Sequence, residues 1–152
     1  GEIKERGTAI AEITLHVGYG TFEPVRVDNL AEHRVSPEHF EISPEAADVL
    51  NSAKSAGRRI VAVGTTTTRA LENCIAATGR FVAGHQTADL TITPRYRFGA
   101  IDALLTNFHL PQSSLLVLVS AFGGHELIMS AYRRAVASRF RFYSYGDCMF
   151  IH

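Results

Sequence analysis

The sequence predicts an α/β fold in which a layered mixed sheet is flanked by helices. Three observations favour this class. Short apolar segments rich in β-branched residues alternate with amphipathic segments of helical period, as in strands and helices that pack in layers. Hydrophobic residues make up 46% and charged residues 20% of the chain, so there is enough apolar surface to bury a core. A length of 152 residues fits one domain.

The first third of the chain contains strand signals and one well-marked helix. Residues 8–17 (TAIAEITLHV) alternate between two faces, so we expect a half-buried strand there. The charged segment that follows is irregular, apart from a short strand expected at 39–42. Ser43 is a typical N-cap, Pro44 suits the first helical position and Gly57 is a stop signal, so a helix is predicted between them.

The middle of the chain predicts a strand, a helix and two further strands. RIVAV at 59–63 is a short apolar strand. After the turn 64–68 a second helix is expected, with Leu71, Cys74, Ile75 and Thr78 at helical spacing, and it is predicted to end before Gly79, a common helix terminator. Residues 88–93 and 98–105 are expected to be the next two strands.

The last third predicts two helices and two short closing strands. The first helix is expected at 112–122, with Gly123-Gly124 after it, and the second at 125–138. Strands are expected at 141–145 and 148–151. The apolar positions of the second helix are predicted to face inward: Leu127, Ile128, Ala131, Ala135 and Val136.

Composition and short patterns argue against several classes of protein. Lys plus Arg and Asp plus Glu both number 15, so net charge gives no reason to expect nucleic acid or a membrane surface as a partner. Cys74 and Cys148 belong to no metal-binding or disulfide pattern, so we expect no metal and a cytoplasmic location. The apolar run at 115–122 is too short to span a bilayer. Because the chain begins with glycine rather than methionine, we expect it to be part of a larger protein.

The turn Gly64-Thr65-Thr66-Thr67-Thr68-Arg69 joins a predicted strand to a predicted helix. Free N–H groups and the helix dipole favour an anion at such a place, and hydroxyl groups and an arginine strengthen that preference. The turn lacks the lysine of a Walker motif, so a nucleoside triphosphate site is unsupported. The structural alternative is that Thr65 or Thr66 caps the helix while Arg69 lies on the surface.

His16 stands at the end of a predicted strand, directly before Gly18-Tyr19-Gly20-Thr21. The two glycines permit a close approach by a ligand or by another part of the chain. A titratable ring beside them suits catalysis, whereas a hydrogen-bonded structural histidine is the alternative.

Asn107 and His109 lie two residues apart where a strand passes into a helix, so their side chains are predicted to project to the same side. They indicate a capped turn, a core histidine with paired ring nitrogens, or a binding or catalytic pocket. Asp147, after Gly146, can orient a histidine, bind a ribose hydroxyl or satisfy the backbone of its own turn.

Four segments occur in a characteristic order: LHVGYGTF (15–22), VGTTTTR (63–69), ALLTNFHLPQSSLLVLVSAF (103–122) and RFYSYGDCMFI (141–151). Together they resemble the C-terminal portion of the S-adenosylmethionine:tRNA ribosyltransferase-isomerase family of queuosine biosynthesis. The resemblance implies a larger two-domain protein, in which a smaller β-barrel domain is inserted into an α/β domain. Residues 1–152 would be the C-terminal α/β portion, and the N-terminal half and the inserted β-barrel domain would be absent here.

The resemblance also implies an activity. The family moves the ribosyl part of S-adenosylmethionine onto 7-aminomethyl-7-deazaguanine at the wobble position of tRNA, which gives epoxyqueuosine and releases adenine and methionine. S-adenosylmethionine is then a consumed co-substrate, and no true cofactor is expected. The implied partner is the tRNA anticodon stem-loop that carries this base, and we expect a cytoplasmic monomer without membrane contact. The alternative is a non-catalytic RNA- or nucleotide-binding α/β module.

This chemistry needs a base at the ribose carbon beside the sulfonium and a proton donor for adenine, and imidazoles suit both tasks. We therefore assign catalysis to His16 and His109, with Asp147 as a third catalytic candidate. Another set of residues is predicted to hold the ribose, the adenine or the methionine carboxylate: Gly18, Gly20, Thr21, Thr65, Thr66, Arg69 and Asn107.

Overall fold

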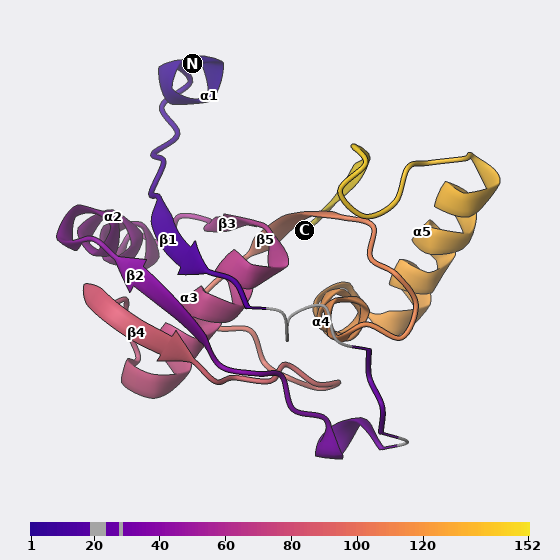
Figure 1. The fold of residues 1–152 in the computed structure, drawn as a ribbon. Helices are drawn as coiled ribbons and strands as arrows, with labels where there is room; N and C mark the ends of the chain where they lie inside the picture. Colours follow the sequence, from indigo (N-terminus) through magenta and orange to yellow (C-terminus); the bar gives the residue numbers. More distant parts are fainter. Residues whose placement is uncertain (19–23, 28) are drawn as a thin grey trace.

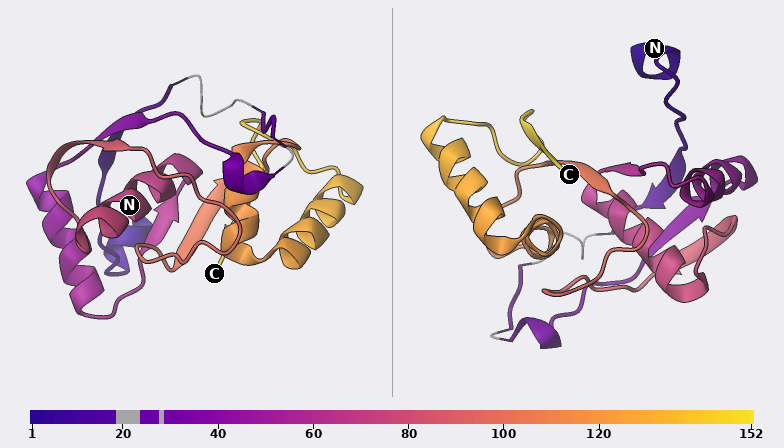
Figure 2. Two further views of the ribbon diagram at one scale, coloured as in Figure 1. Left: turned by 90° about the horizontal axis from the view of Figure 1, so that it is seen from below. Right: turned by 180° about the vertical axis from the view of Figure 1, so that it is seen from behind.

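The computed structural model describes residues 1–18, 24–27 and 29–152 of the chain. Figures 1 and 2 show α4 and α5 on the opposite side of the molecule from α2, while α1 stands apart from the body. The predicted α/β class is confirmed, although the described strands form two three-stranded sheets rather than one layered sheet. In chain order the elements are α1 (Glu2–Glu5), β1 (Ile13–His16), the 3-10 helix η2 (Leu30–Glu32), β2 (Glu38–Ile42), α2 (Pro44–Ser55), β3 (Val61–Val63), α3 (Thr65–Thr78), β4 (Gly84–Ala88), β5 (Ala103–Asn107), α4 (Ser114–Gly123), α5 (His125–Ala137) and β6 (Cys148–Ile151).

The first sheet is antiparallel and has β2 between β1 and β4. Along β2, the side chains of Glu38, Phe40 and Ile42 are buried while His39 is exposed, as the alternation of a strand requires. Helix α3 contacts β1 and β4 of this sheet and also β3 and β5 of the second sheet. The inward position of Glu38 places a carboxylate in the interior, where it needs a partner.

The second sheet is mixed, because β3 pairs in parallel with β5 and β6 pairs antiparallel to β5. The carboxyl ends of two parallel strands lie at the same edge of a sheet. The chain leaves β3 directly into α3, and it leaves β5 through residues 108–113 into α4. This topology brings the amino ends of α3 and α4 to one edge of the sheet.

Several predicted elements are confirmed by the structure. The Ser43 hydroxyl accepts a hydrogen bond from the backbone N–H of Ala46 at 3.1 Å, so α2 begins where the cap predicts. Helix α3 ends at Gly79 as predicted, in the left-handed conformation typical of a C-cap, but it begins earlier than expected, because residues 65–68 of the predicted turn form its first turn. The predicted strand at 148–151 is also present as β6.

Two predicted strands are wrong. The strand expected at 88–93 lies earlier, at 84–88, where a mostly polar segment pairs with the edge of β2. Residues 141–145 form no strand, because Tyr143 has a φ of 62° and its N–H donates to the carbonyl of Phe108. In both cases contacts with distant parts of the chain decide the conformation.

The inward face of α5 differs from the predicted one. Ile128 and Ala135 are buried as expected, but the side chains of Leu127 and Val136 are 66% and 64% exposed. Tyr132 takes the inward position instead, and its ring packs edge-on against Phe108 at a centroid distance of 5.4 Å. The large aromatic ring therefore sets the orientation of the helix.

The break between α4 and α5 occurs at two glycines. Gly124 has a φ of 84°, and a Cβ atom at Gly123 would lie 2.7 Å from Ile128 Cδ1, so both positions favour glycine. Among the described residues, no single helix is long and apolar enough to cross a membrane; α4 and α5 meet that criterion only as a pair, with a bend of 117° between them.

Candidate active site

A hollow of about 320 Å³ lies where the amino ends of α3 and α4 meet. Thr65 and Thr66 of α3 and Ser114 of α4 line it, together with the charged side chains of Glu38 and Arg69 and several apolar side chains. Its position is the strand-to-helix edge at which open α/β sheets bind ligands. This figure includes space open to solvent, and the centre of a water-sized atom can occupy only about 20 Å³ of it, so the hollow suits one group of a larger ligand.

Within residues 1–18, 24–27 and 29–152, the amino end of α3 has no side-chain cap, because a glycine occupies the N-cap position. Gly64 is the N-cap residue, with a φ of 95° that favours glycine, and its carbonyl accepts the N–H of Thr68 at 3.1 Å. Thr65 and Thr66 occupy the first two helical positions, so the structural alternative in which one of them caps the helix is wrong. The first N–H groups of a helix have no partner within it, so they are available to an acceptor in the hollow.

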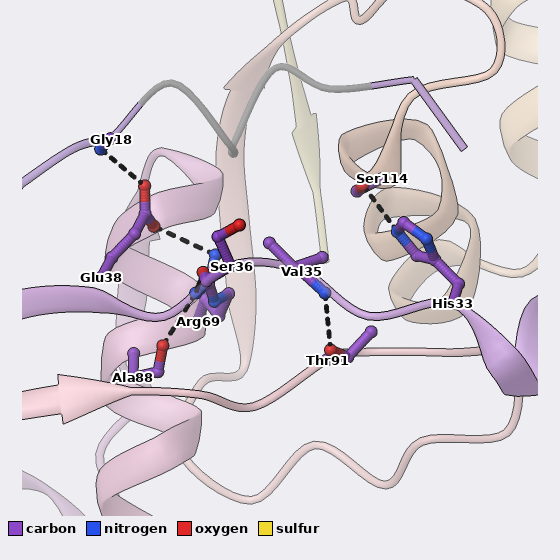
Figure 3. Close-up of polar contacts among 9 residues, drawn as sticks. All are labelled: Gly18, His33, Val35, Ser36, Glu38, Arg69, Ala88, Thr91 and Ser114. Atoms are coloured by element: carbon purple, nitrogen blue, oxygen red, sulfur yellow. Dashed lines mark hydrogen bonds and ion pairs between the residues drawn. The ribbon is translucent and has the colours of Figure 1, made fainter. Parts of the chain in front are cut away.

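Arg69 lies in the interior with 5% of its surface exposed, so the alternative of a surface position is wrong. Its Nη1 pairs with Glu38 Oε2 at 3.0 Å, and its Nη2 donates to the carbonyls of Ala88, at 2.8 Å, and Ser36 (Figure 3). Burial lowers the pKa of Arg69, and the charges of Glu38 and Asp89 oppose that shift. The Nε atom of Arg69 has no hydrogen-bond partner within the described ranges.

Glu38 connects this arginine to the segment that follows β1. Its Oε1 accepts the backbone N–H of Gly18 at 3.3 Å, while Oε2 is paired with Arg69 (Figure 3). Gly18 is thereby held beside the charged pair of β2 and α3. Gly20 and Thr21, two of the predicted substrate-binding residues, lie outside the described residues.

A second buried polar pair reaches the same hollow. His33 Nε2 lies 2.8 Å from the hydroxyl oxygen of Ser114, and both residues are buried (Figure 3). Sequence reasoning missed His33, Glu38 and Ser114. The alternation of Glu38 with Phe40 and Ile42 was a usable signal, because it places a charged side chain on the inward face of a strand. His33 precedes β2 in an irregular segment and carries no such signal.

His109 is a buried, neutral histidine. Its Nε2 lies 3.0 Å from Thr106 Oγ1, and its backbone N–H donates to the Tyr132 hydroxyl at 2.8 Å. Burial lowers the pKa of His109 to about 4. This geometry matches the interpretation of a core histidine with a paired ring nitrogen.

Asn107 is exposed, so the expectation that it projects to the same side as the buried His109 is wrong. Phe108 between them turns into the core, where its ring packs against Tyr132. The Asn107 side chain instead donates to the carbonyl of Asp147 at 3.4 Å. The structure therefore places the two predicted residues in different environments.

Asp147 stabilises its own turn, which is one of the alternatives that the sequence left open. Its Oδ2 accepts the backbone N–H of Arg141 and also Nε at 3.2 Å, and its Oδ1 accepts Nη2 at 3.3 Å. These hydrogen bonds from Arg141 hold the pKa of the Asp147 carboxyl below its usual range. A catalytic role for Asp147 stays a prediction.

His16 lies on the solvent face of the first sheet, opposite His39 of β2. Both line a broad hollow of about 740 Å³ with His85 and Thr87 of β4. Glu38 and Phe40 point to the other face of the sheet, so His16 and the Arg69 hollow are on opposite sides of it. Within the part of the chain that the structure describes, no group of three or more His, Cys, Asp or Glu side chains has the geometry of a metal site.

Comparisons with known proteins give a consistent set of relatives. An S-adenosylmethionine:tRNA ribosyltransferase-isomerase of Geobacter sulfurreducens is 55% identical over 150 residues, which are 99% of this chain and 44% of that protein. A protein of the same name from Ralstonia nicotianae is 57% identical over 139 residues, which are 91% of this chain and 39% of that protein. The chain thus spans less than half the length of these curated relatives.

A solved structure and a family model agree with these relatives. The crystal structure of an S-adenosylmethionine tRNA ribosyltransferase from Thermotoga maritima superimposes with a TM-score of 0.77 at 41% identity and covers 99% of this chain and 47% of that chain. The family model described as "Queuosine biosynthesis protein" matches residues 1–151. With its α/β architecture and the hollow between α3 and α4, the chain belongs to the queuosine biosynthesis protein family.

Proposed function

We propose that residues 1–152 are the C-terminal α/β portion of an S-adenosylmethionine:tRNA ribosyltransferase-isomerase, with an N-terminal half and an inserted β-barrel elsewhere in the whole protein. The observation that carries this proposal is the identity of 55% across 99% of the chain to a relative of that name. The comparisons give no support to a non-catalytic RNA- or nucleotide-binding module.

The proposed reaction transfers the ribosyl part of S-adenosylmethionine to the aminomethyl group of 7-aminomethyl-7-deazaguanine in tRNA and yields epoxyqueuosine, adenine and methionine. S-adenosylmethionine is consumed as a co-substrate. The other partner is the tRNA anticodon stem-loop that carries this base, and the enzyme acts as a cytoplasmic monomer.

Within this reaction the hollow between α3 and α4 seats part of S-adenosylmethionine. Thr65 and Thr66 line the hollow at an uncapped helix amino end, which supports their role in substrate binding. Gly18 is held beside Arg69 through Glu38, which supports a position of Gly18 next to the substrate. Arg69 contributes through its field and its Nε–H, because both of its Nη atoms already have partners.

Proton transfer is assigned to His16 and His109, with Asp147 as a further candidate. The ring of His109 is neutral near pH 7, since burial lowers its pKa to about 4. A base with such a pKa is weak, because catalysis favours a pKa near the working pH. His16 is the other candidate, and it lies on the opposite side of the first sheet from the Arg69 hollow.

The test uses the full-length enzyme that carries this chain. It is incubated with S-adenosylmethionine and tRNA bearing 7-aminomethyl-7-deazaguanine, and the nucleosides are examined by mass spectrometry for epoxyqueuosine. Matched reactions omit S-adenosylmethionine or use tRNA with an unmodified wobble base. A folded, intact enzyme that forms no epoxyqueuosine under these conditions would sink the proposal.

Single substitutions then test the assigned residues. Asn107→Ala and His109→Ala are expected to lower turnover while circular dichroism shows a retained fold, and Ser130→Ala, at an exposed position of α5, serves as the control. Persistent activity in both variants would mean that the 106–109 turn is structural only.

A further inference from the structure

The hollow between α3 and α4 collects hydrogen-bond donors from three directions. The uncapped amino end of α3 contributes the N–H groups of its first turn, and Thr65 and Thr66 of that turn line the hollow. Helix α4 begins at Ser114, which lines the same hollow, although the Ser113 hydroxyl already accepts the N–H of Leu116 at 3.2 Å. Both helix dipoles therefore point their positive ends at one small volume, which favours a negatively charged group.

Arg69 supplies an independent sign that a ligand belongs there. It is 5% exposed, it lines the hollow, and its Nε–H has no hydrogen-bond partner within the described ranges. A buried N–H of a guanidinium is costly to leave unpaired, so a native structure normally supplies an acceptor. An acceptor on a bound ligand meets that need.

The His33–Ser114 pair completes the donor set. Ser114 has a hydroxyl group at the hollow, and His33 Nε2 lies 2.8 Å from it on the protein side. When His33 donates its Nε2–H to the serine oxygen, the serine proton is free to turn toward a ligand. His33 is then a positioning residue that acts through Ser114.

The charges in the hollow also select the orientation of the ligand. Glu38 lines the side next to Arg69 and repels an anion there, although its charge is offset by Arg69 at 3.0 Å. The anionic group is therefore best placed against Ser114 and the helix ends, with any cationic group toward Glu38. An α-amino acid carries both charges on two groups attached to the same carbon.

Resting on the proposed function, we infer that this hollow binds the amino-acid end of S-adenosylmethionine, with Ser114 donating to the α-carboxylate and His33 holding Ser114 in place. The carboxylate is the single anionic group of this substrate, and it matches the Ser114 hydroxyl and the N–H groups at the amino end of α3. A tRNA phosphate is the rival anion. A phosphodiester continues into the chain on both sides, whereas a small hollow accommodates a terminal group.

The test measures binding to the full-length enzyme by calorimetry, with two ligands. S-adenosylmethionine carries the amino-acid end, and 5′-methylthioadenosine lacks it. Ser114→Ala is expected to weaken binding of S-adenosylmethionine about tenfold or more, the usual loss of one hydrogen bond to a charged group, while binding of 5′-methylthioadenosine changes less than about twofold. Ser130→Ala, an exposed serine of α5, is the matched control.

His33 is tested by rescue. His33→Leu removes the donor to Ser114 and is expected to weaken binding of S-adenosylmethionine in the same ligand-selective way, whereas His33→Gln keeps an amide donor and restores most of the affinity. If the role of His33 is only structural, His33→Leu should weaken the binding of both ligands equally, and His33→Gln should not restore the affinity for S-adenosylmethionine.

The outcomes separate this inference from the proposed function. Equal effects of Ser114→Ala on both ligands, no effect on either, or a rise in KM for tRNA instead of S-adenosylmethionine would overturn the subsite while epoxyqueuosine is still formed. Failure of the unmodified enzyme to bind S-adenosylmethionine at all would reject the proposed function and the subsite together.

Discussion

Replacing Arg69 by methionine keeps most of the apolar stem of the side chain and removes its charge and all its donors. In the folded protein Glu38 then stays buried without its cation, and the carbonyls of Ser36 and Ala88 lose the donor Nη2. The change therefore tests whether the interior ion pair between β2 and α3 is needed for the fold.

The expected magnitude follows from the distance and the burial. Two unit charges 3.0 Å apart attract by about 5 kcal/mol at an effective dielectric constant of about 20. The desolvation of both groups offsets much of that attraction, so the pair adds little net stability. Removing one partner of a buried pair costs about 3–5 kcal/mol, because an uncompensated charge remains. Such a loss is a large part of the roughly 5–15 kcal/mol by which native proteins are stable.

The assay is urea denaturation at pH 7, followed by circular dichroism, on the unmodified chain, Arg69→Met, Glu38→Gln and the double variant. We expect Arg69→Met to lose about 3–5 kcal/mol, and the double variant to lose at least about 1 kcal/mol less than the two single losses added together. Arg133→Met, an exposed arginine of α5, should change stability by less than about 0.5 kcal/mol. A loss below about 1 kcal/mol in Arg69→Met, or strict additivity in the double variant, would refute the reasoning.

Two further predictions concern other buried groups. Burial lowers the pKa of His109 from about 6.5 in the unfolded chain to about 4, so protonation of this ring favours unfolding. The free energy of unfolding should therefore lose nothing to His109 above about pH 6.5 and should fall by about 3 kcal/mol between pH 6.5 and pH 4. The urea midpoint should fall with pH across this range in the unmodified chain and should change less with pH in His109→Gln. An equal pH dependence in both proteins would contradict the attribution of this effect to His109. The fully buried Glu72 accepts the backbone N–H groups of Gly99, Ala100 and Ile101 at 2.8, 2.9 and 3.2 Å, so Glu72→Ala should destabilise the fold by about 3–5 kcal/mol. A thermal unfolding midpoint within 2 °C of the unmodified chain, roughly, would contradict that prediction.

The sequence predicts the helices well because their signals are local. Ser43 and Pro44 start α2 through contacts within four residues, and Gly79 ends α3 through its own backbone conformation. Strand β4 was not predicted, because its mostly polar residues show no apolar alternation. Pairing with β2, a distant part of the chain, holds it in the extended conformation. Tyr143 likewise adopts its positive φ where its N–H meets the carbonyl of Phe108.

The candidate site divides in the same way. The strand-to-helix turn at Gly64 was predictable from the GTTTTR motif, whereas the position of Thr65 and Thr66 inside the first turn of α3 was not. The relation between Asn107 and His109 was not, because it depends on Phe108 packing against Tyr132 of α5. Residues two apart face the same side only while the strand continues.

The sequence by itself determined the α/β class, the family resemblance and the strand-to-helix turn at Gly64, since each depends on neighbouring residues or on motif order. Only the tertiary structure decided that Glu38 neutralises Arg69 across 31 positions and that His33 meets Ser114 across 81. The physical reason is desolvation. A buried polar group must find a partner in the folded interior, and that partner is chosen by packing rather than by sequence neighbourhood.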